Sequence, residues 1–134
     1  MSYFPSSVKN TEEALNYLAK LAQNIVTVVT TAATTLTATA AQLIEGIFNL
    51  AGGTTMALTV PTAAAIVAGM DNPQVGSFFE FTIVNGNSGT ATLTTNTGCT
   101  LVGLATLATT LSGTWKVVLT NVTEGAEAVS IYRV

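Results

Sequence analysis

The chain of 134 residues contains no histidine, and only 8% of its residues are charged. Histidine is the most common general base and metal ligand, so its absence excludes the usual triads of nucleophilic catalysis. The phosphate-binding pattern GxxxxGK[ST] does not occur either. The sequence therefore predicts a protein that is not an enzyme and that carries neither a cofactor nor a metal.

Cysteines and membrane-spanning segments are equally scarce. Cys99 is the only cysteine, which excludes an intramolecular disulfide, and we expect it to be a small buried apolar residue. The longest uncharged run, residues 21–44, contains seven threonines and is too polar for a membrane-spanning helix. The N-terminal residues lack the basic and apolar regions of a secretion signal. We therefore expect no membrane partner and assembly in a cytosol.

The few charges are unevenly placed. Between Leu21 and Trp115 only Glu45, Asp71 and Glu80 are ionised, whereas typical domains are about 25% charged. The net charge of −3 and the scattered Lys and Arg residues argue against nucleic acid as a partner. A soluble monomer usually keeps a mixed charged surface, so this chain is expected to hide much of its surface in an assembly.

The acidic residues are weak candidates for chemistry. Glu80 lies between Phe79 and Phe81 on an expected strand, and the alternation places its side chain toward solvent or an interface. Oxygen ligands for Ca²⁺ could come from Asp71 and Asn72 together with Glu124 or Glu127, although turn chemistry explains these residues equally well. Trp115 could be a sugar-stacking platform, but its phase with Val117 and Leu119 favours a place in the core.

Two segments are expected before the β-rich part of the chain. Residues 1–10 read as an extended arm, in which Tyr3 and Phe4 could anchor in a partner's groove or fold back onto the chain's own core. Residues 11–25 read as a helix, which could support self-association or lie on the chain's own β-domain. The 3-4-3 spacing of its apolar stripe supports the helix; the stripe comprises Leu15, Leu18, Ala22 and Ile25.

Residues 26–134 show the sequence pattern of a single β-domain. Eight to ten short strands alternate with turns rich in Gly, Asn and Ser, which predicts an antiparallel β-sandwich or barrel. Residues 40–46 read as a helical turn, and residues 62–70 as a short helix that begins at Thr62. The run TTAATTLTATAA, residues 30–41, is predicted to be partly β-strand and to lie at or near a subunit contact, because β-branched threonine favours strands and carries no charge.

Four phrases in this order, LTVPTAAAIVAG, VGSFFEFTIVN, SGTWKVVLTNV and AVSIYRV, are similar to β-rich virion proteins of tailed phages. They resemble small capsid decoration (cement) proteins in particular, over about residues 35–134. The resemblance implies a jelly-roll-like domain, usually a homotrimer, bound to the exterior of an icosahedral head where capsomers meet. The major capsid protein would be its partner, and the protein would brace the shell against the pressure of the packaged DNA.

A second interpretation is a receptor- or carbohydrate-binding tip module of a phage tail fibre. Such a module would need exposed aromatic residues or clusters of Asp and Asn on its loops. The expected loops DNPQVG (71–76) and NGNSG (85–89) are short and contain no aromatic residue. Binding to a glycan array would favour this alternative over the decoration protein.

Overall fold

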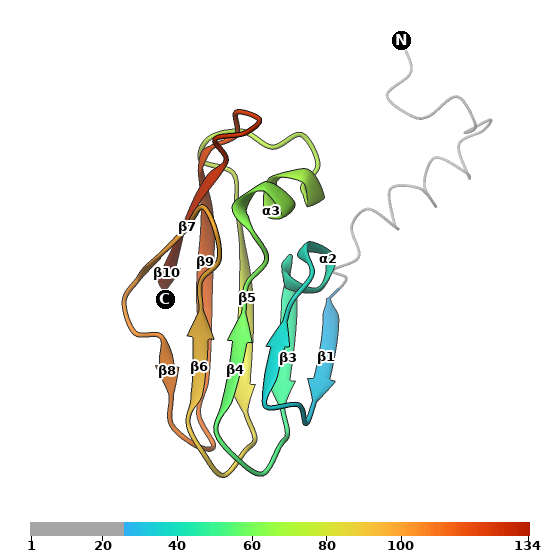
Figure 1. Ribbon diagram of the computed structural model, residues 1–134, viewed down its shortest axis with the longest axis vertical. Helices are drawn as coiled ribbons and strands as arrows, with labels where there is room; N and C mark the ends of the chain where they lie inside the picture. Colours follow the sequence, from blue (N-terminus) through green and yellow to red (C-terminus); the bar gives the residue numbers. More distant parts are fainter. Residues whose placement is uncertain (1–25) are drawn as a thin grey trace, which may run out of the picture.

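The computed structural model describes residues 26–134, which form two β-sheets packed face to face around one core (Figure 1). The six-stranded sheet has the order β1 (Thr27–Thr31), β3 (Gly46–Leu50), β5 (Phe78–Asn85), β9 (Ser112–Asn121), β10 (Ala128–Arg133) and β7 (Cys99–Val102). The four-stranded sheet has the order β2 (Thr35–Thr37), β4 (Met56–Thr59), β6 (Ala91–Thr94) and β8 (Thr106–Leu107). The expected mainly β, sandwich-like fold is confirmed, whereas the expected arm 1–10 and helix 11–25 lie outside the described residues.

Strand direction differs from the antiparallel expectation. Five of the eight strand pairings are parallel, among them β1 with β3, β3 with β5, β2 with β4 and β4 with β6. The remaining three, β5 with β9, β9 with β10 and β6 with β8, are antiparallel. The jelly-roll expectation therefore holds for the two packed sheets but not for the strand connections, since jelly rolls are antiparallel.

The order in which the chain visits the sheets explains the parallel pairs. From β1 to β6 each strand lies in the sheet opposite to the strand before it. The chain thus returns to a given sheet after one strand in the other sheet, and it then runs parallel to its predecessor. A long crossover helix, which a parallel pair usually requires, is replaced here by a strand of the facing sheet.

Two short helices close one end of the sandwich (Figure 1). Helix α2 (Ala40–Leu43) begins with a capping box, in which Thr39 and Gln42 exchange side chain to backbone hydrogen bonds of 3.2 and 3.0 Å. Helix α3 (Ala63–Gly69) begins after Thr62, whose hydroxyl accepts a 3.2 Å hydrogen bond from the amide of Ala65. The expected helical turn and the expected helix at 62–70 are both confirmed.

The core lies between the sheets and is formed by the side chains that the alternation predicted to point inward. Phe79, Phe81 and Ile83 of β5 face Met56 and Leu58 of the other sheet, and all are buried. The largest fully buried side chains also include Trp115, Phe48, Leu43, Leu50, Ile66, Leu119, Ile131 and Val60. Burial of apolar surface on this scale is the dominant stabilising contribution to such a domain.

The threonine-rich run 30–41 is divided among three elements. It contains the end of β1, all of β2 and the start of α2. The predicted β-strand content of this run is thereby confirmed. Thr30 lies on the outward side of the six-stranded sheet, and Thr35 and Thr37 lie on the outward side of the four-stranded sheet.

Candidate interaction surfaces

The described residues contain no cluster of side chains that could hold a metal ion. Within residues 26–134, no group of three or more His, Cys, Asp or Glu side chains is close enough to hold a metal ion. Asp71, Glu124 and Glu127, the possible Ca²⁺ ligands, form no such group. None of the helices in the same range is long and apolar enough to cross a membrane.

The outward side of the six-stranded sheet, which we call the apolar face, exposes an unusual number of large hydrophobic side chains. Cross-strand pairing aligns outward positions in rows, for example Val28 beside Ile47 and Tyr132 beside Val102. Phe78 and Val28 are each 59% exposed, and Tyr132 is 40% exposed. The apolar members of this face are Val28, Ile47, Phe78, Val84, Val102, Val118, Tyr132 and Val134.

The two charged side chains of the apolar face neutralise one another. Glu80 and Lys116 are direct cross-strand neighbours on β5 and β9, and the Lys116 Nζ lies 3.7 Å from the Glu80 Oε1. The same ammonium group lies 4.8 Å from the centroid of the Phe78 ring, a cation–π distance. Beside this pair, the hydroxyls of Thr82 and Thr114 share a hydrogen bond of 2.9 Å. Polar groups in the middle of the face are thus already partnered within the chain.

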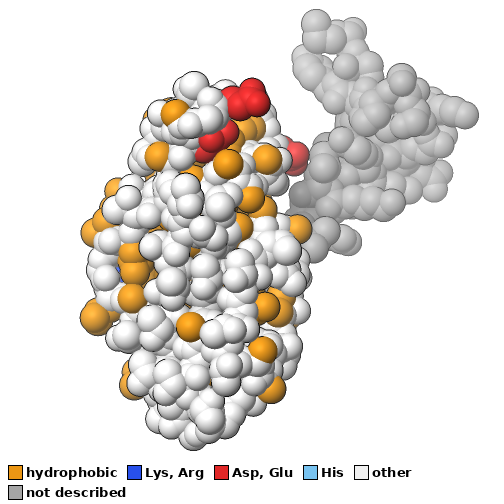
Figure 2. All heavy atoms as spheres, viewed as in Figure 1, with side chains coloured by type: hydrophobic (Ala, Val, Ile, Leu, Met, Phe, Trp, Pro, Cys, Tyr) orange, Lys and Arg blue, Asp and Glu red, His pale blue; other side chains and the backbone are white. Residues whose placement is uncertain are grey.

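The outward side of the four-stranded sheet, which we call the threonine face, has a different chemistry. Pairing aligns Thr35, Ala57, Thr92 and Thr106 in one row and Thr37, Thr59 and Thr94 in the next. Every outward strand position of this sheet is thus threonine or alanine, and none is charged. Figure 2 shows this side of the molecule, with the acidic side chains gathered at the end that carries α3.

The two edge strands on one side of the sandwich, β1 in the six-stranded sheet and β2 in the four-stranded sheet, are uncharged. β1 (TVVTT) and β2 (TLT) are the first strands of their sheets, and neither contains a charged residue or a proline. Natural proteins usually protect open edges with Lys, Pro or bulges, because an unprotected edge can pair with another chain. At this side of the sandwich a protein partner could therefore pair a strand of its own with β1 or β2.

Three residues that the sequence singled out have clear positions. Trp115 is fully buried, which confirms the core interpretation, and its indole donates a 3.3 Å hydrogen bond to the carbonyl of Leu104. Glu80 points outward, as expected. Arg133, by contrast, lies on the inward side with its guanidinium 4.5 Å from the centre of the Trp115 ring, and Gly113 leaves the space that it occupies. Nothing in the sequence pattern indicated that a terminal arginine would cover the core.

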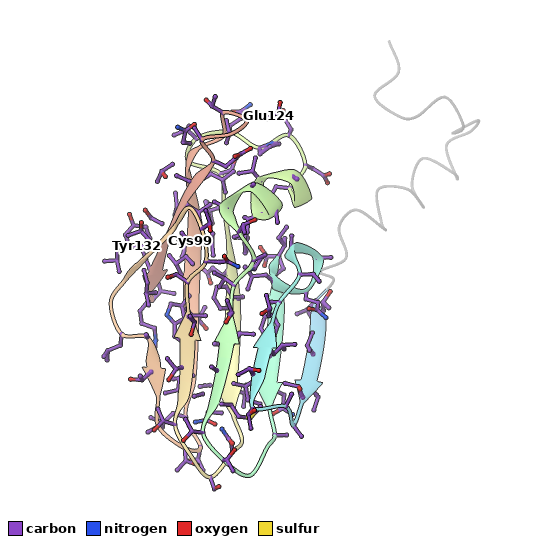
Figure 3. All side chains as sticks on the ribbon, viewed as in Figure 1. Cys99, Glu124 and Tyr132 are labelled. Atoms are coloured by element: carbon purple, nitrogen blue, oxygen red, sulfur yellow. The ribbon has the colours of Figure 1, made fainter. Side chains whose placement is uncertain are left out.

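Cys99 lies at the edge of the core rather than in its centre. Its side chain is half-buried and packs against the core residues, and its Sγ lies 3.5 Å from the carbonyl oxygen of Pro61. Burial raises the pKa of this thiol, and the hydrogen bond from the backbone of Asn96 opposes that effect only in part. Cys99 is therefore a weakly reactive apolar residue, close to the expected role. Figure 3 shows it with Tyr132, and with Glu124 at the end of the sandwich.

The predicted contact residues in the N-terminal segment lie outside the described residues. They are Tyr3, Phe4, Leu15, Leu18, Ala22 and Ile25. The apolar face was not predicted as a unit, although alternation correctly placed Phe78, Glu80, Thr82 and Val84 on one side of their strand. The missing information was the strand order, which brings Val28, Tyr132 and Val102 onto the same side.

Comparison with known protein families, curated proteins and solved structures finds no match to this chain.

Proposed function

We propose that the chain is a virion structural protein, a decoration (cement) protein that binds the exterior of an icosahedral phage head. One observation carries the proposal: among residues 26–134, one outward sheet face has a single, internally neutralised ion pair and the other has no charge. The cores of protein interfaces are depleted in charged residues in the same way. A protein that worked as a free monomer would have little reason to keep both broad surfaces nearly free of charge.

Shell stabilisation would follow from mass action. A protein that binds the assembled shell but not its dissociated subunits stabilises the shell by an amount that grows with its free concentration. Binding of a closed homotrimer at junctions of the major capsid protein would join several weak contacts into one tight attachment. This mechanism needs no catalytic group and no cofactor, only surfaces that can be buried without leaving a charge unpaired.

The test is co-sedimentation of the full-length chain with heads of the virus that encodes it, prepared without this protein. We expect saturable binding to the head exterior and an increase in the temperature at which the heads rupture. The control uses the same heads after saturation with the protein, and these heads should bind no additional protein. If the chain stays in the supernatant, or sediments with tails instead of heads, the proposal is wrong.

The alternative of a carbohydrate-binding tip module has one observation in its favour. Phe78 and Tyr132 are exposed aromatic residues on the same sheet face, on either side of Lys116. Aromatic rings on a flat sheet can stack against sugars. A glycan array tests this alternative directly: binding that is lost in both Phe78→Ala and Tyr132→Ala would favour a tip module.

A further inference from the structure

We infer that copies of this chain associate with one another through the apolar face of the six-stranded sheet. The inference deepens the proposed function, because it names the surface that would form the homo-oligomer. Three properties of this face support self-association: its composition, its charge balance and its size.

The face combines large exposed apolar side chains with two internally partnered polar pairs in its middle, Glu80 with Lys116 and Thr82 with Thr114. Six of the ten large hydrophobic side chains that are exposed within residues 26–134 lie on it. They are Val28, Phe78, Val84, Val102, Tyr132 and Val134. Aromatic residues are enriched and charged residues depleted at the centres of protein interfaces. Monomeric proteins seldom leave such a patch in water, so the exposure of this set indicates that another surface covers it.

The charge balance favours a second copy as the occupant. Glu80 and Lys116 are cross-strand neighbours 3.7 Å apart, and they are the charged side chains on this face. A second copy of the same face brings the same neutral pair, so no charge is left without a partner when the two surfaces meet. A partner with a net charged patch would have to be desolvated against a surface that offers no unpaired counter-charge, which is costly.

The size of the face is also sufficient. Its strands are four to ten residues long. With neighbouring strands about 4.8 Å apart and a rise of about 3.3 Å per residue, the six strands cover a flat area of about 600 Å². The accessible surface of a corrugated sheet exceeds its flat area, and a specific interface buries about 800 Å² on each partner. The whole face therefore reaches the lower end of the range for specific interfaces, about 600 Å² on each partner.

The threonine face of the same chain provides a matched control surface. It carries no charge, and it exposes hydroxyl and methyl groups instead of large apolar side chains. A glutamate introduced on either face adds the same charge at an exposed strand position. Different effects of the two substitutions therefore report which face is buried in the oligomer.

The experiment is sedimentation equilibrium of the full-length chain and of four variants over a wide range of concentrations. Phe78→Glu and Tyr132→Glu change the apolar face, and Thr94→Glu and Thr106→Glu change the threonine face. We expect the unaltered chain and both threonine-face variants to sediment as multiples of the 13.7 kDa chain. In both apolar-face variants the concentration at which the oligomer dissociates should rise roughly tenfold or more, because each variant leaves a net negative charge on a face that holds one cation, Lys116. The far-UV circular dichroism of every variant should retain the spectrum of the folded β-domain.

Charge reversal supplies a second readout. Glu80→Lys and Lys116→Glu each place two like charges side by side, so each should weaken association, whereas the double variant restores a neutral pair and should recover it. The inference is overturned if the unaltered chain is monomeric at all concentrations, if the apolar-face variants keep its mass, or if only the threonine-face variants dissociate. Head binding is measured separately: a chain that associates as inferred but does not bind heads contradicts the proposed function alone.

Discussion

The ring of Phe81 stacks on the indole of Trp115, with centroids 5.7 Å apart and an angle of 14° between the planes. Phe81 also meets Phe48 edge-on at a centroid distance of 6.3 Å, and the guanidinium of Arg133 lies over the indole. These four side chains come from β3, β5, β9 and β10, the central strands of the six-stranded sheet. The aromatic cluster therefore joins neighbouring strands of the sheet that carries the apolar face.

Removal of the indole should be severely destabilising. We predict that Trp115→Ala lowers the free energy of unfolding by about 3–5 kcal/mol, because it leaves a large cavity and removes the stacking contact. Urea denaturation at one fixed protein concentration measures the change. Val75→Ala, at a position that is 67% exposed in a loop, is the control and should change stability by less than about 0.5 kcal/mol. Equal losses in the two variants would contradict the account of the core.

Asn85 joins two loops at the end of the sandwich opposite the helices. Its Nδ2 lies 2.9, 3.0 and 3.1 Å from the carbonyl oxygens of Gly89, Leu107 and Ala108, and its Oδ1 accepts a hydrogen bond from the amide of Asn87. The side chain is fully buried. Each of these groups loses a partner when the amide is removed, and a buried group without a partner costs about 1–3 kcal/mol.

Asn85→Ala is therefore expected to lower stability by about 2–4 kcal/mol and to accelerate hydrogen exchange at the amide of Asn87. The control is Asn121→Ala, which removes one exposed hydrogen bond to the amide of Thr123 and should cost at most about 1 kcal/mol. Unchanged exchange at Asn87 in the Asn85 variant would show that the buried amide does not hold the loop.

Thr110 has a backbone conformation that β-branched residues rarely adopt, with φ at 65°. Glycine adopts this conformation without strain, so Thr110→Gly should raise the free energy of unfolding by about 1 kcal/mol. The neighbouring substitution Thr109→Gly should lower it, because the Thr109 hydroxyl donates a hydrogen bond to the carbonyl of Asn87. Thermal unfolding of the two variants gives opposite shifts if the strain is real; a loss of stability in both would refute it.

The thiol of Cys99 makes stability depend on pH in the alkaline range. Burial raises its pKa above the ordinary value of 9.0, so the folded state holds the thiol proton more tightly than the unfolded state does. The resulting stabilisation is fully present below pH 9 and is lost as the pH rises through the folded pKa. The difference in unfolding free energy between the unaltered chain and Cys99→Ala should shrink above pH 9. A constant difference from pH 7 to 11 would contradict this effect.

The local structure was predictable because it depends on short-range patterns. Alternation identified the inward set Phe79, Phe81 and Ile83, and the cap at Thr62 identified the start of α3. Burial of Trp115 followed from its phase with Val117 and Leu119. These signals need no knowledge of which strands are neighbours.

Strand direction and strand order were not predictable in the same way. The turns between the short strands predicted an antiparallel arrangement, but most of these links connect the two sheets, so neighbours within a sheet are separated by an intervening strand. This long-range pairing places Val28 and Tyr132 on one face although they are far apart in the sequence. The inward position of Arg133 depends on its register with Trp115, which no local pattern contains.

The most direct test of the account is the mass of the full-length chain in solution, measured by sedimentation equilibrium without any partner. Burial of the apolar face against a second copy of the same face predicts a stable multiple of the 13.7 kDa chain. A highly soluble species of 13.7 kDa that persists at all concentrations would contradict the claim that the apolar face is covered by a second copy of the chain.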